Sequence, residues 1–420
     1  MRRVAVTGIG VISPLGGSAA ESFANAATGH SAIGRIEEPW CKRLVSPLAA
    51  CVNFRADEHF AAPKLRMLDR VSQIAVVAAR QAVDGARLDI ANVDPQRIGV
   101  FVGTAMGGSQ TTDDGYETLY AEQSDRIKPF TILMGMTNAA AAWIGIEYGV
   151  TGPNLTYSTA CSSSAVSIGE AWLRLRNGDL DVAIAGGAEA PLSFGALKAW
   201  EALHTLASED PNDASTSCKP FSRNRSGMVL GEGAAIVVLE DWERAIKRGA
   251  TIHGELAGYG VTTDVSHITQ PTAAGQASAM RAALHAARCA PESIDTINAH
   301  GTGTQANDSV ETAAIKQVFG EDAYRIPISA TKAIHGHLLG ASGALELSLS
   351  LLAMQHDVLL PTMHLELTAD DCDLDYVPNC ARHGVKLNSV MSNSFAFGGT
   401  NAVLVARSAR SAAVRCGQNN

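Results

Sequence analysis

The pattern of apolar and polar positions along the chain alternates between two kinds of segment. In 164–177 the apolar residues recur at helical spacing, and similar periodicity predicts helices at 72–84 and 344–355. Short apolar runs bounded by turn-forming residues predict strands, at 97–104, 154–160, 181–186, 234–240, 296–300, 326–330 and 402–406. This alternation predicts an α/β fold made of layers of helix and sheet.

Two segments of the chain share one order of elements, a strand, a tight turn and a helix. They are NLTYSTACSSSAVSIGEAWLRLRNG at 154–178 and IPISATKAIHGHLLGASGALELSLSLLAMQ at 326–355. The echo predicts two similar halves, 1–250 and 251–408, joined near 248–255. Between them the polar stretch 208–227 is expected to be a surface excursion, and 409–420 a flexible tail.

Composition and charge narrow the class of protein. The chain has 420 residues, and 46% of them are hydrophobic, which is enough for a large core. Its formal net charge of −9 argues against nucleic-acid binding. No apolar stretch reaches the roughly 18 residues of a membrane span. The apolar run near the N-terminus is broken by Gly8, Gly10 and Pro14, so we interpret it as a strand and turn rather than a signal peptide. We expect a soluble, cytoplasmic protein that binds neither nucleic acid nor membrane.

Cys161 differs in context from the other cysteines of the chain, none of which shows the C-x-x-C spacing of zinc or redox sites. It ends a strand-like run and opens a helix. A cysteine at a helix N-terminus lies near oriented N–H groups and the positive end of the dipole, which favours its thiolate. The same N–H groups could hold an oxyanion. The alternative is a buried structural thiol at a strand-to-helix turn.

The segment NAHGTGT at 298–304 is the second candidate site. His300 ends a predicted strand, and the glycines after it allow the backbone to approach a ligand closely. The hydroxyls of Thr302 and Thr304 add polar contacts. Asp308 and Glu311 have the spacing of a helix N-cap and its capping partner. A structural, hydrogen-bonded histidine is the alternative.

A third candidate is the Gly-rich stretch 330–343, which contains Lys332, His335 and His337 before a predicted helix. Glu346, early in that helix, could pair with Lys332. The two histidines could also bind a metal, but no carboxylate is spaced to complete such a site, so we predict none. A fourth candidate, 392–401, sets two phenylalanines on a Gly-rich turn, where they could gate a pocket or belong to the core.

Six short motifs follow one another along the chain. They are TACSSS at 159–164, AGGAE at 185–189, GEGAAIVVLE at 231–240, NAHGTGT at 298–304, TKAIHGHLLGASGALE at 331–346 and NSFAFGGTN at 393–401. Together they resemble the elongating type II branch of the β-ketoacyl synthases, in the thiolase superfamily. The likeness runs from about residue 2 to residue 407. It implies a thiolase-like, five-layered α/β/α/β/α fold of two similar halves. It also implies a homodimer, an acyl carrier protein as partner, and no cofactor.

The resemblance also assigns roles to individual residues. Cys161 matches the family nucleophile, and His300 and His337 match its two histidines. Lys332 matches a further catalytic residue, which Glu346 holds in place. Phe397 matches a gating residue whose N–H joins that of Cys161 in the oxyanion hole. Thr302 and Thr304 match residues that contact the phosphopantetheine arm. His335 falls on a variable position and receives no role.

The implied reaction is a decarboxylative Claisen condensation in fatty-acid elongation. The Cys161 thiolate takes an acyl chain from a carrier thioester, giving a covalent acyl-enzyme. Malonyl-carrier then loses CO₂, and two histidine N–H groups would stabilise the enolate oxygen that forms. The enolate carbon attacks the acyl group and gives a 3-oxoacyl-carrier. Lys332 would add positive potential and order the histidine loop.

Departures from the family pattern leave the acyl specificity open. Ser162, Ser163 and Ser164 follow the cysteine, a form frequent in polyketide synthases, and Ala396 replaces the usual glycine between the two phenylalanines. Three residues are placed in the acyl pocket by the resemblance: Met106, Trp200 and Met228. A ketosynthase of a specialised polyketide, polyene or modified fatty-acid pathway is therefore an alternative to housekeeping elongation.

Several residues distinguish this chain from proteins of other functions. Cys161 argues against a non-catalytic chain-length factor, although a partner-dependent heterodimer subunit and a carrier-binding protein without turnover stay open. A thiolase would carry a second cysteine in 393–401, and an initiating synthase would carry asparagine where His337 stands.

Because carrier proteins are acidic, docking needs a local basic patch. The family positions for this patch are Lys64, Arg66, Arg126 and Lys128.

Overall fold

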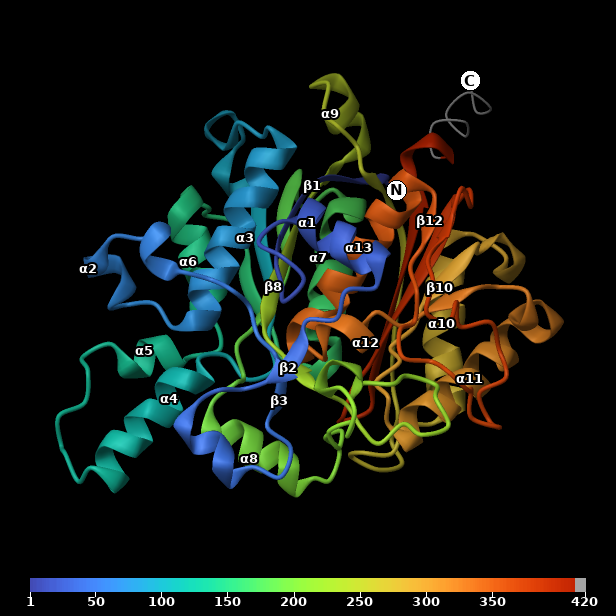
Figure 1. Ribbon diagram of the computed structural model, residues 1–420. Coiled ribbons are helices and arrows are strands. Elements are labelled where there is room, and N and C mark those ends of the chain that lie inside the picture. The colour runs from blue at the N-terminus through green and yellow to red at the C-terminus, as the bar shows by residue number, and fades with distance from the viewer. Residues whose placement is uncertain (412–420) are drawn as a thin grey trace.

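The central feature of the fold is one mixed sheet of ten strands (Figure 1). The computed structural model describes residues 1–411, so 412–420 of the predicted tail lie outside the described residues. Across the sheet the strands are β11 (Ile328–Ser329), β10 (Thr296–Asn298), β14 (Ser389–Phe395), β15 (Thr400–Ser408), β9 (Gly254–Thr263), β1 (Val4–Ile12), β8 (Gly233–Asp241), β6 (Val182–Glu189), β4 (Ile98–Gly103) and β5 (Asn154–Tyr157).

The two ends of this sheet repeat one arrangement. On one side β5, β4 and β6 are parallel, and β8 and β1 follow in antiparallel pairs. On the other side β11, β10 and β14 are parallel, and β15 and β9 follow in antiparallel pairs. The halves meet where β1 pairs with β9, with Val4 opposite Leu256 and Val6 opposite Gly254. The predicted pair of similar halves is confirmed by this strand order.

Helices cover both outer faces of the sheet and fill the space between its halves (Figure 1). On one outer face of the sheet, α3 packs on β1 and β8, and α6 lies beside it. On the other outer face, α10 packs on β9 and β15, and α11 lies beside it. The middle layer contains α7 and α13, which contact each other. The predicted five-layered architecture is confirmed. These helices are α3 (Arg70–Ala86), α6 (Ala139–Tyr148), α7 (Ser163–Asn177), α10 (Ala273–Ala287), α11 (Gln305–Phe319) and α13 (Ser342–His356).

The remaining elements are short. The helices are α1 (Ala19–Thr28), α2 (Ala62–Leu65), α4 (Ser109–Tyr116), α5 (Thr131–Gly135), α8 (Phe194–Ala202), α9 (Trp242–Lys247) and α12 (Lys332–His335). The strands are β2 (Ile33–Arg35), β3 (Leu48–Ala50), β7 (Leu230–Gly231), β12 (Val358–Leu359) and β13 (Arg382–His383). Among residues 1–411, no helix has the length and apolar content that crossing a membrane requires.

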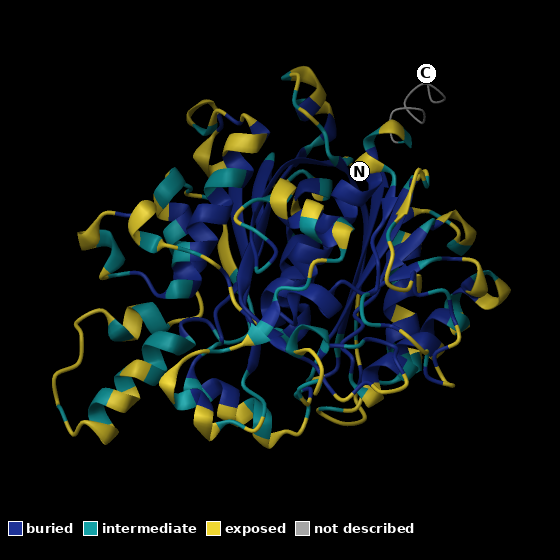
Figure 2. Ribbon diagram, viewed as in Figure 1, coloured by how far each residue is buried: buried dark blue, intermediate teal, exposed yellow. Residues whose placement is uncertain are grey.

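The middle layer encloses one of the predicted helices on every face. All residues of α13 from Ser342 to Met354 are buried, because sheet and helix surround it (Figure 2). The predicted strands at 296–300 and 326–330 are only three and two residues long in the structure. Each ends early because the chain leaves the sheet to form the loops that carry His300 and Lys332.

The expectation of a surface excursion over 208–227 is wrong for its second half. Cys218, Phe221 and Arg225 are buried. The ring of Phe221 stacks on that of Tyr376 with 4.0 Å between centroids. The Arg225 guanidinium donates to the backbone carbonyl of Thr304 at 3.2 Å. The segment folds inward because it supports the loop that follows His300.

Candidate active site

The turn between β5 and α7 places Cys161 at the start of the central helix. Cys161 lies in one turn of 3₁₀ helix, Ala160–Ser162, directly before α7. Ala160 has a φ of +48°, a left-handed conformation that is uncommon outside glycine. Gly103 at the end of β4 lets the sheet approach closely, because a Cβ there would overlap the backbone of Ser163. The resulting position leaves the Cys161 side chain 5% exposed.

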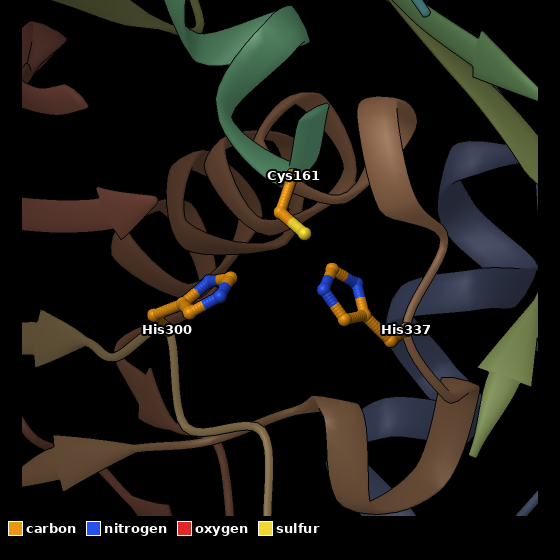
Figure 3. A group of neighbouring side chains, drawn as sticks. All are labelled: Cys161, His300 and His337. Atoms are coloured by element: carbon orange, nitrogen blue, oxygen red, sulfur yellow. The ribbon is translucent and has the colours of Figure 1, made fainter. Parts of the chain in front are cut away.

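Three side chains from distant parts of the chain meet at this point (Figure 3). The sulfur of Cys161 points between the rings of His300 and His337, and one ligand atom of each residue lies within 4.8 Å of the other two. The imidazole centroids are 5.4 Å apart and the rings are nearly perpendicular, at 82°. The structure therefore brings together the three residues that the sequence picked out independently.

The hydrogen bonds of His337 define which ring nitrogen carries its proton. The backbone N–H of Leu339 donates to Nδ1 at 3.2 Å, so Nδ1 is an acceptor. The hydroxyl of Ser342 lies 2.9 Å from the same nitrogen. Burial, followed by the nearby positive charge of Lys332, lowers the pKa of His337 well below its ordinary value, so the ring is neutral. Its proton therefore sits on Nε2, a buried atom with no partner among the described residues.

Lys332 defines the state of His300 in a comparable way. Its ammonium lies 2.6 Å from the carbonyl oxygen of His300 and 3.3 Å from His300 Nδ1, and it also donates to Glu346 Oε1. These three acceptors match the three N–H groups of an ammonium. Burial, and then the charge of Lys332, lowers the pKa of His300 well below its ordinary value. The proton of the neutral His300 ring therefore also sits on Nε2.

The pairing of Lys332 with Glu346, predicted from their spacing, is present. Both side chains are almost fully buried, at 1% and 0% exposed. Burial raises the pKa of Glu346 to about 7, although the ammonium favours its charged form. Removing one partner of such a pair leaves the other charge unpaired in the interior, which is strongly destabilising.

Burial outweighs the N–H groups at the helix start, which by themselves favour the Cys161 thiolate as predicted. Burial raises the pKa of the Cys161 thiol to about 12, while the charge of Lys332 and the backbone N–H of Phe397 act in the opposite direction. Desolvation penalises the thiolate more than these groups stabilise it. The side chain at rest is a neutral thiol. The backbone N–H of Phe397 therefore acts on this sulfur as a hydrogen-bond donor.

Asp308 and Glu311 do not cap their helix, contrary to prediction. The N-cap of α11 is Thr304, whose hydroxyl accepts from the N–H of Asn307 at 3.3 Å. Asp308 and Glu311 lie one and two turns inside α11, and both are fully buried. Their carboxylates accept backbone N–H groups of the preceding loop, at 2.8 Å from His300, 2.9 Å from Gly301 and 3.1 Å from Thr302.

These two carboxylates hold the histidine loop in place. Burial raises the pKa of both, that of Asp308 to about 6. Sequence reasoning found the residues but missed this role. The available signal was a pair of acids three residues apart after a Gly-rich loop, a pattern that also describes a capping box.

Glu189 is a further buried residue whose role the sequence did not reveal. Its carboxylate accepts the Thr104 hydroxyl at 3.0 Å and the backbone N–H groups of Ala105, Met106 and Gly340 at 2.6, 2.9 and 2.9 Å. It thereby ties the loop after β4 to the loop after His337. Burial raises its pKa to about 7 despite these bonds. Only its place in the AGGAE motif could have marked it.

A hollow of about 570 Å³ opens onto Cys161. Met228, Thr302 and Thr304 line it, together with Phe397 and the two histidines. The hydroxyls of Thr302 and Thr304 are 2.8 Å apart. The other lining residues are His267, Ile268, Thr269, Gln270, Pro271, Ala306, Asn307, Phe395, Ala396, Gly399 and Asn401.

The other predicted pocket residues lie next to this hollow rather than on it. Met106 and Trp200 pack against the apolar cluster that contains Cys161 and Met228. The indole of Trp200 stacks on the Phe397 ring, with centroids 6.0 Å apart and an angle of 21°. Trp200 therefore supports the phenylalanine that borders the hollow.

The predicted docking residues lie outside the site. Lys64 is tied to Glu147 by an ion pair of 2.6 Å. Arg66, Arg126 and Lys128 are exposed, and the last two border a separate hollow beside α4 and α5. Lys64 is therefore the least available of the four to an external partner.

The three side chains that meet here are of the kinds that bind zinc, but their surroundings oppose a metal ion. The Lys332 ammonium contacts the ring of His300 and raises the local positive potential, which opposes a cation. Both neutral rings hold their proton on Nε2 and use Nδ1 as a hydrogen-bond acceptor, whereas a neutral imidazole binds metal through its unprotonated nitrogen. The arrangement suits an anion or a polarised oxygen between the rings.

Comparison with known families agrees with this geometry. Residues 1–245 match the model described as "Beta-ketoacyl synthase, N-terminal domain", and residues 253–366 match "Beta-ketoacyl synthase, C-terminal domain". The two matches cover most of the chain, and between them they include Cys161, His300 and His337.

Individual relatives cover nearly the whole length. The "3-oxoacyl-[acyl-carrier-protein] synthase 2" of Staphylococcus aureus (strain N315) is 40% identical, over 96% of this chain and 98% of its own. "Nodulation protein E" of Rhizobium meliloti (strain 1021) is 42% identical, over the same shares. A solved structure described as "AntDE:AntF (apo): type II PKS acyl-carrier protein in complex with its ketosynthase bound to the hexaketide" is 31% identical, with a TM-score of 0.90, over 97% of this chain and 99% of that one. The chain belongs to the β-ketoacyl synthase family and is a condensing acyltransferase of the type II, thiolase-like kind.

Proposed function

We propose that this protein is an elongating 3-oxoacyl-(acyl carrier protein) synthase, in which Cys161 carries the acyl chain and His300 and His337 assist decarboxylation of malonyl-carrier. One observation carries the proposal: two neutral imidazoles, each with Nε2–H, flank the Cys161 sulfur. The names of the Staphylococcus aureus relative and of the carrier complex support a carrier-bound substrate.

The first half-reaction is a thioester exchange. The sulfur of Cys161 attacks the carbonyl carbon of the acyl-carrier, and the oxyanion lies against the N–H groups of Cys161 and Phe397. The bond to the phosphopantetheine sulfur then breaks. The proton of the Cys161 thiol ends on the departing carrier thiol, so charge is conserved. Thr302 and Thr304, whose hydroxyls border the hollow, bind the pantetheine arm.

The second half-reaction needs no strong base. The malonyl thioester oxygen lies between the two Nε2–H groups, and the C–C bond to the carboxylate breaks to release CO₂. The electron pair becomes an enolate, whose oxygen the two N–H groups stabilise. The enolate carbon attacks the acyl group, and the Cys161 sulfur leaves. Lys332, by donating to His300 Nδ1, keeps that ring in the donor form.

The proposal includes a division of the chain into two halves, which the strand order supports. We assign 1–250 to the half that carries the nucleophile and 251–408 to the half that carries the histidines. The junction falls in the segment between β8 and β9. A cytoplasmic location belongs to the same proposal.

A second copy of the chain is the proposed partner at the edge of the sheet. Strand β5 is an outermost strand and has an unpaired edge. Large apolar side chains are exposed on β5 and on the adjacent α6: Leu155 is 39% exposed and Ile146 is 67% exposed. Such a surface favours association. We propose a homodimer, with a heterodimer of two related synthases as the alternative. Light scattering of the purified chain tests this: a single monomeric species at micromolar concentration would contradict the homodimer.

The carrier protein is proposed to dock on exposed basic residues. Arg66 and Lys128 are the most informative because both are exposed. Reversing both charges to glutamate should raise the KM for acyl-carrier several-fold and leave kcat unchanged, since an exposed charge acts mainly on association. Reversal of Arg325, an exposed arginine on the opposite half, is the matched control. An unchanged KM would remove these residues from the docking surface.

Specialised lipid or polyketide synthesis is the second candidate function. The serines after Cys161 and the Trp200 indole against Phe397 favour an unusual acyl chain. The 42% identity to nodulation protein E is at least as high as that to the Staphylococcus aureus synthase. A panel of acyl-carrier donors that differ in length and unsaturation separates the two functions.

The central experiment uses intact-mass measurement. Wild type and Cys161→Ala are incubated with the donor panel, and an acyl adduct is expected on the wild type alone. Malonyl-carrier added next should discharge the adduct and yield one CO₂ per 3-oxoacyl product. Absence of an adduct with every donor would overturn the proposal for the chain alone, and the test is then repeated with a candidate partner synthase.

A further inference from the structure

A second hollow lies at the opposite end of α7 from Cys161. It has a volume of about 540 Å³ and is lined by residues of both halves. Because α7 has 15 residues, its two ends are separated by about 22 Å. The lining includes five arginines and a single carboxylate, Glu255; the arginines are Arg2, Arg3, Arg176, Arg288 and Arg407.

Two of these arginines are neutralised by neighbouring acids. Arg3 binds Glu255 at 3.0 and 3.1 Å and also lies over the ring of Trp242. Arg2 binds Asp181 at 2.9 Å and lies 3.7 Å from Asp241. Their charges are therefore used inside the protein.

The other three arginines have no carboxylate within ion-pair distance among residues 1–411. Arg407 is 7% exposed and donates to the carbonyl of Ala287 at 2.5 Å; it pairs across the sheet with Glu255, whose carboxylate is taken by Arg3. Arg176 lies over the ring of Trp172, with 4.6 Å to its centroid. Three positive charges are thus gathered in one hollow of a protein whose net charge is −9.

The ends of two helices offer a competing explanation, since arginines near a helix C-terminus compensate its dipole. Arg176 is in the last turn of α7 and Arg288 is the C-cap of α10. Arg407 does donate to the last carbonyl of α10, at Ala287, but neither Arg176 nor Arg288 donates to a carbonyl of its helix in the described structure. The two also repel each other: burial and then the charge of Arg288 lower the pKa of Arg176. Like charges facing an open hollow are better explained by an anion that fits between them.

We propose that this hollow is a binding site for a phosphorylated small molecule, held by Arg176, Arg288 and Arg407. The guanidinium group binds phosphate through two parallel N–H bonds, and three positive charges without a carboxylate partner in residues 1–411 suit a di- or trivalent anion. The site is formed by the end of α7, the end of α10 and strand β15, so it bridges both halves. It does not depend on the condensation chemistry at Cys161.

Inorganic pyrophosphate is the probe for this site, with inorganic phosphate and citrate in parallel. Titration calorimetry at about 50 mM salt should show one pyrophosphate site per chain, and binding should weaken as salt is raised to about 500 mM. The double variant R176Q/R288Q should bind at least about tenfold more weakly, because two charge-assisted pairs are lost. The matched control is Arg174→Gln, in the same helical turn, whose side chain pairs with Asp179 instead.

The outcomes separate a specific site from general attraction. Equal weakening in R174Q and in the double variant would show that only overall charge matters, and would overturn the proposal. So would the absence of pyrophosphate binding at millimolar concentration in the wild type. Tighter binding of citrate than of pyrophosphate would overturn the phosphate assignment. Acylation of Cys161 by a donor, measured on each variant, shows that the protein is folded.

Discussion

The two halves of the molecule repeat one arrangement of strands, but they bring groups of opposite character to the site. The first half surrounds Cys161 with apolar side chains, and its loops are held by Glu189, which accepts backbone N–H groups and a hydroxyl. The second half brings a buried ammonium and a buried carboxylate that meet, next to two neutral imidazoles. In the first half, backbone geometry positions the nucleophile, Cys161. In the second half, a buried ion pair positions the two histidine donors.

This difference predicts which changes each half tolerates. In the first half a small, neutral substitution should remove chemistry without disturbing the fold. In the second half the same loss of one functional group should also cost stability, because a charge is left without its partner. Four substitutions, ordered from the largest expected effect to the smallest, test the comparison.

Cys161→Ala should abolish acyl transfer and condensation while leaving thermal stability within a few degrees of wild type. The side chain makes no ion pair among the described residues, and its removal leaves only a small gap beside an open hollow. Intact mass and a thermal melt measure the two effects. A large loss of stability would show that the first half is as tightly coupled as the second.

Lys332→Met should reduce both activity and stability. Glu346 loses its ammonium and His300 loses the donor to Nδ1, so we expect a loss of about 3–5 kcal/mol in the free energy of unfolding. The double variant K332M/E346L is the control: it leaves no unpaired carboxylate, so stability should return while activity stays low. Denaturant titration checks both. If K332M alone unfolds like the wild type, the buried pair does not stabilise the fold.

His337→Phe should separate the two half-reactions. The ring is neutral and buried, so phenylalanine can replace its volume but not its Nε2–H. Acylation of Cys161 should proceed, whereas release of CO₂ from malonyl-carrier should slow by about 10²- to 10³-fold, the usual cost of one lost oxyanion donor. His335→Gln is the matched control, because His335 lies in the same loop and bonds Thr331 instead. Equal slowing in both variants would refute the assignment.

Glu189→Gln should have the smallest effect, and that effect should depend on pH. The folded protein raises the Glu189 pKa from 4.5 to about 7, so the folded state binds the proton more tightly than the unfolded chain. Its contribution to stability is therefore fully present below pH 4.5 and is lost as pH rises toward 7 and above. The amide does not titrate, so E189Q should reduce the fall in melting temperature over this range. An unchanged profile would show that Glu189 does not titrate there.

The sequence predicted the elements more reliably than their ends. Helical periodicity located α3, α7 and α13 to within two residues at either end, because apolar residues recur along each at helical spacing. Strands β10 and β11 were predicted too long, since a strand that leads into a site loop has the same residues as one that stays paired. The two echoing segments correctly indicated two halves, although strand direction became visible only in the sheet.

What the sequence alone determined was the architecture and the set of reactive residues: Cys161 before a helix, His300 and His337 in Gly-rich loops, and Lys332 spaced to meet Glu346. Local pattern is enough for these, because helix and strand periods and short motifs depend on neighbours in the chain. Only the tertiary structure decided that the thiol is neutral at rest and that Asp308 and Glu311 hold a loop instead of capping a helix. Only the structure showed that three arginines with no carboxylate partner in residues 1–411 share one hollow. Burial and charge pairing depend on groups that lie far apart in sequence, so no local pattern could have predicted them.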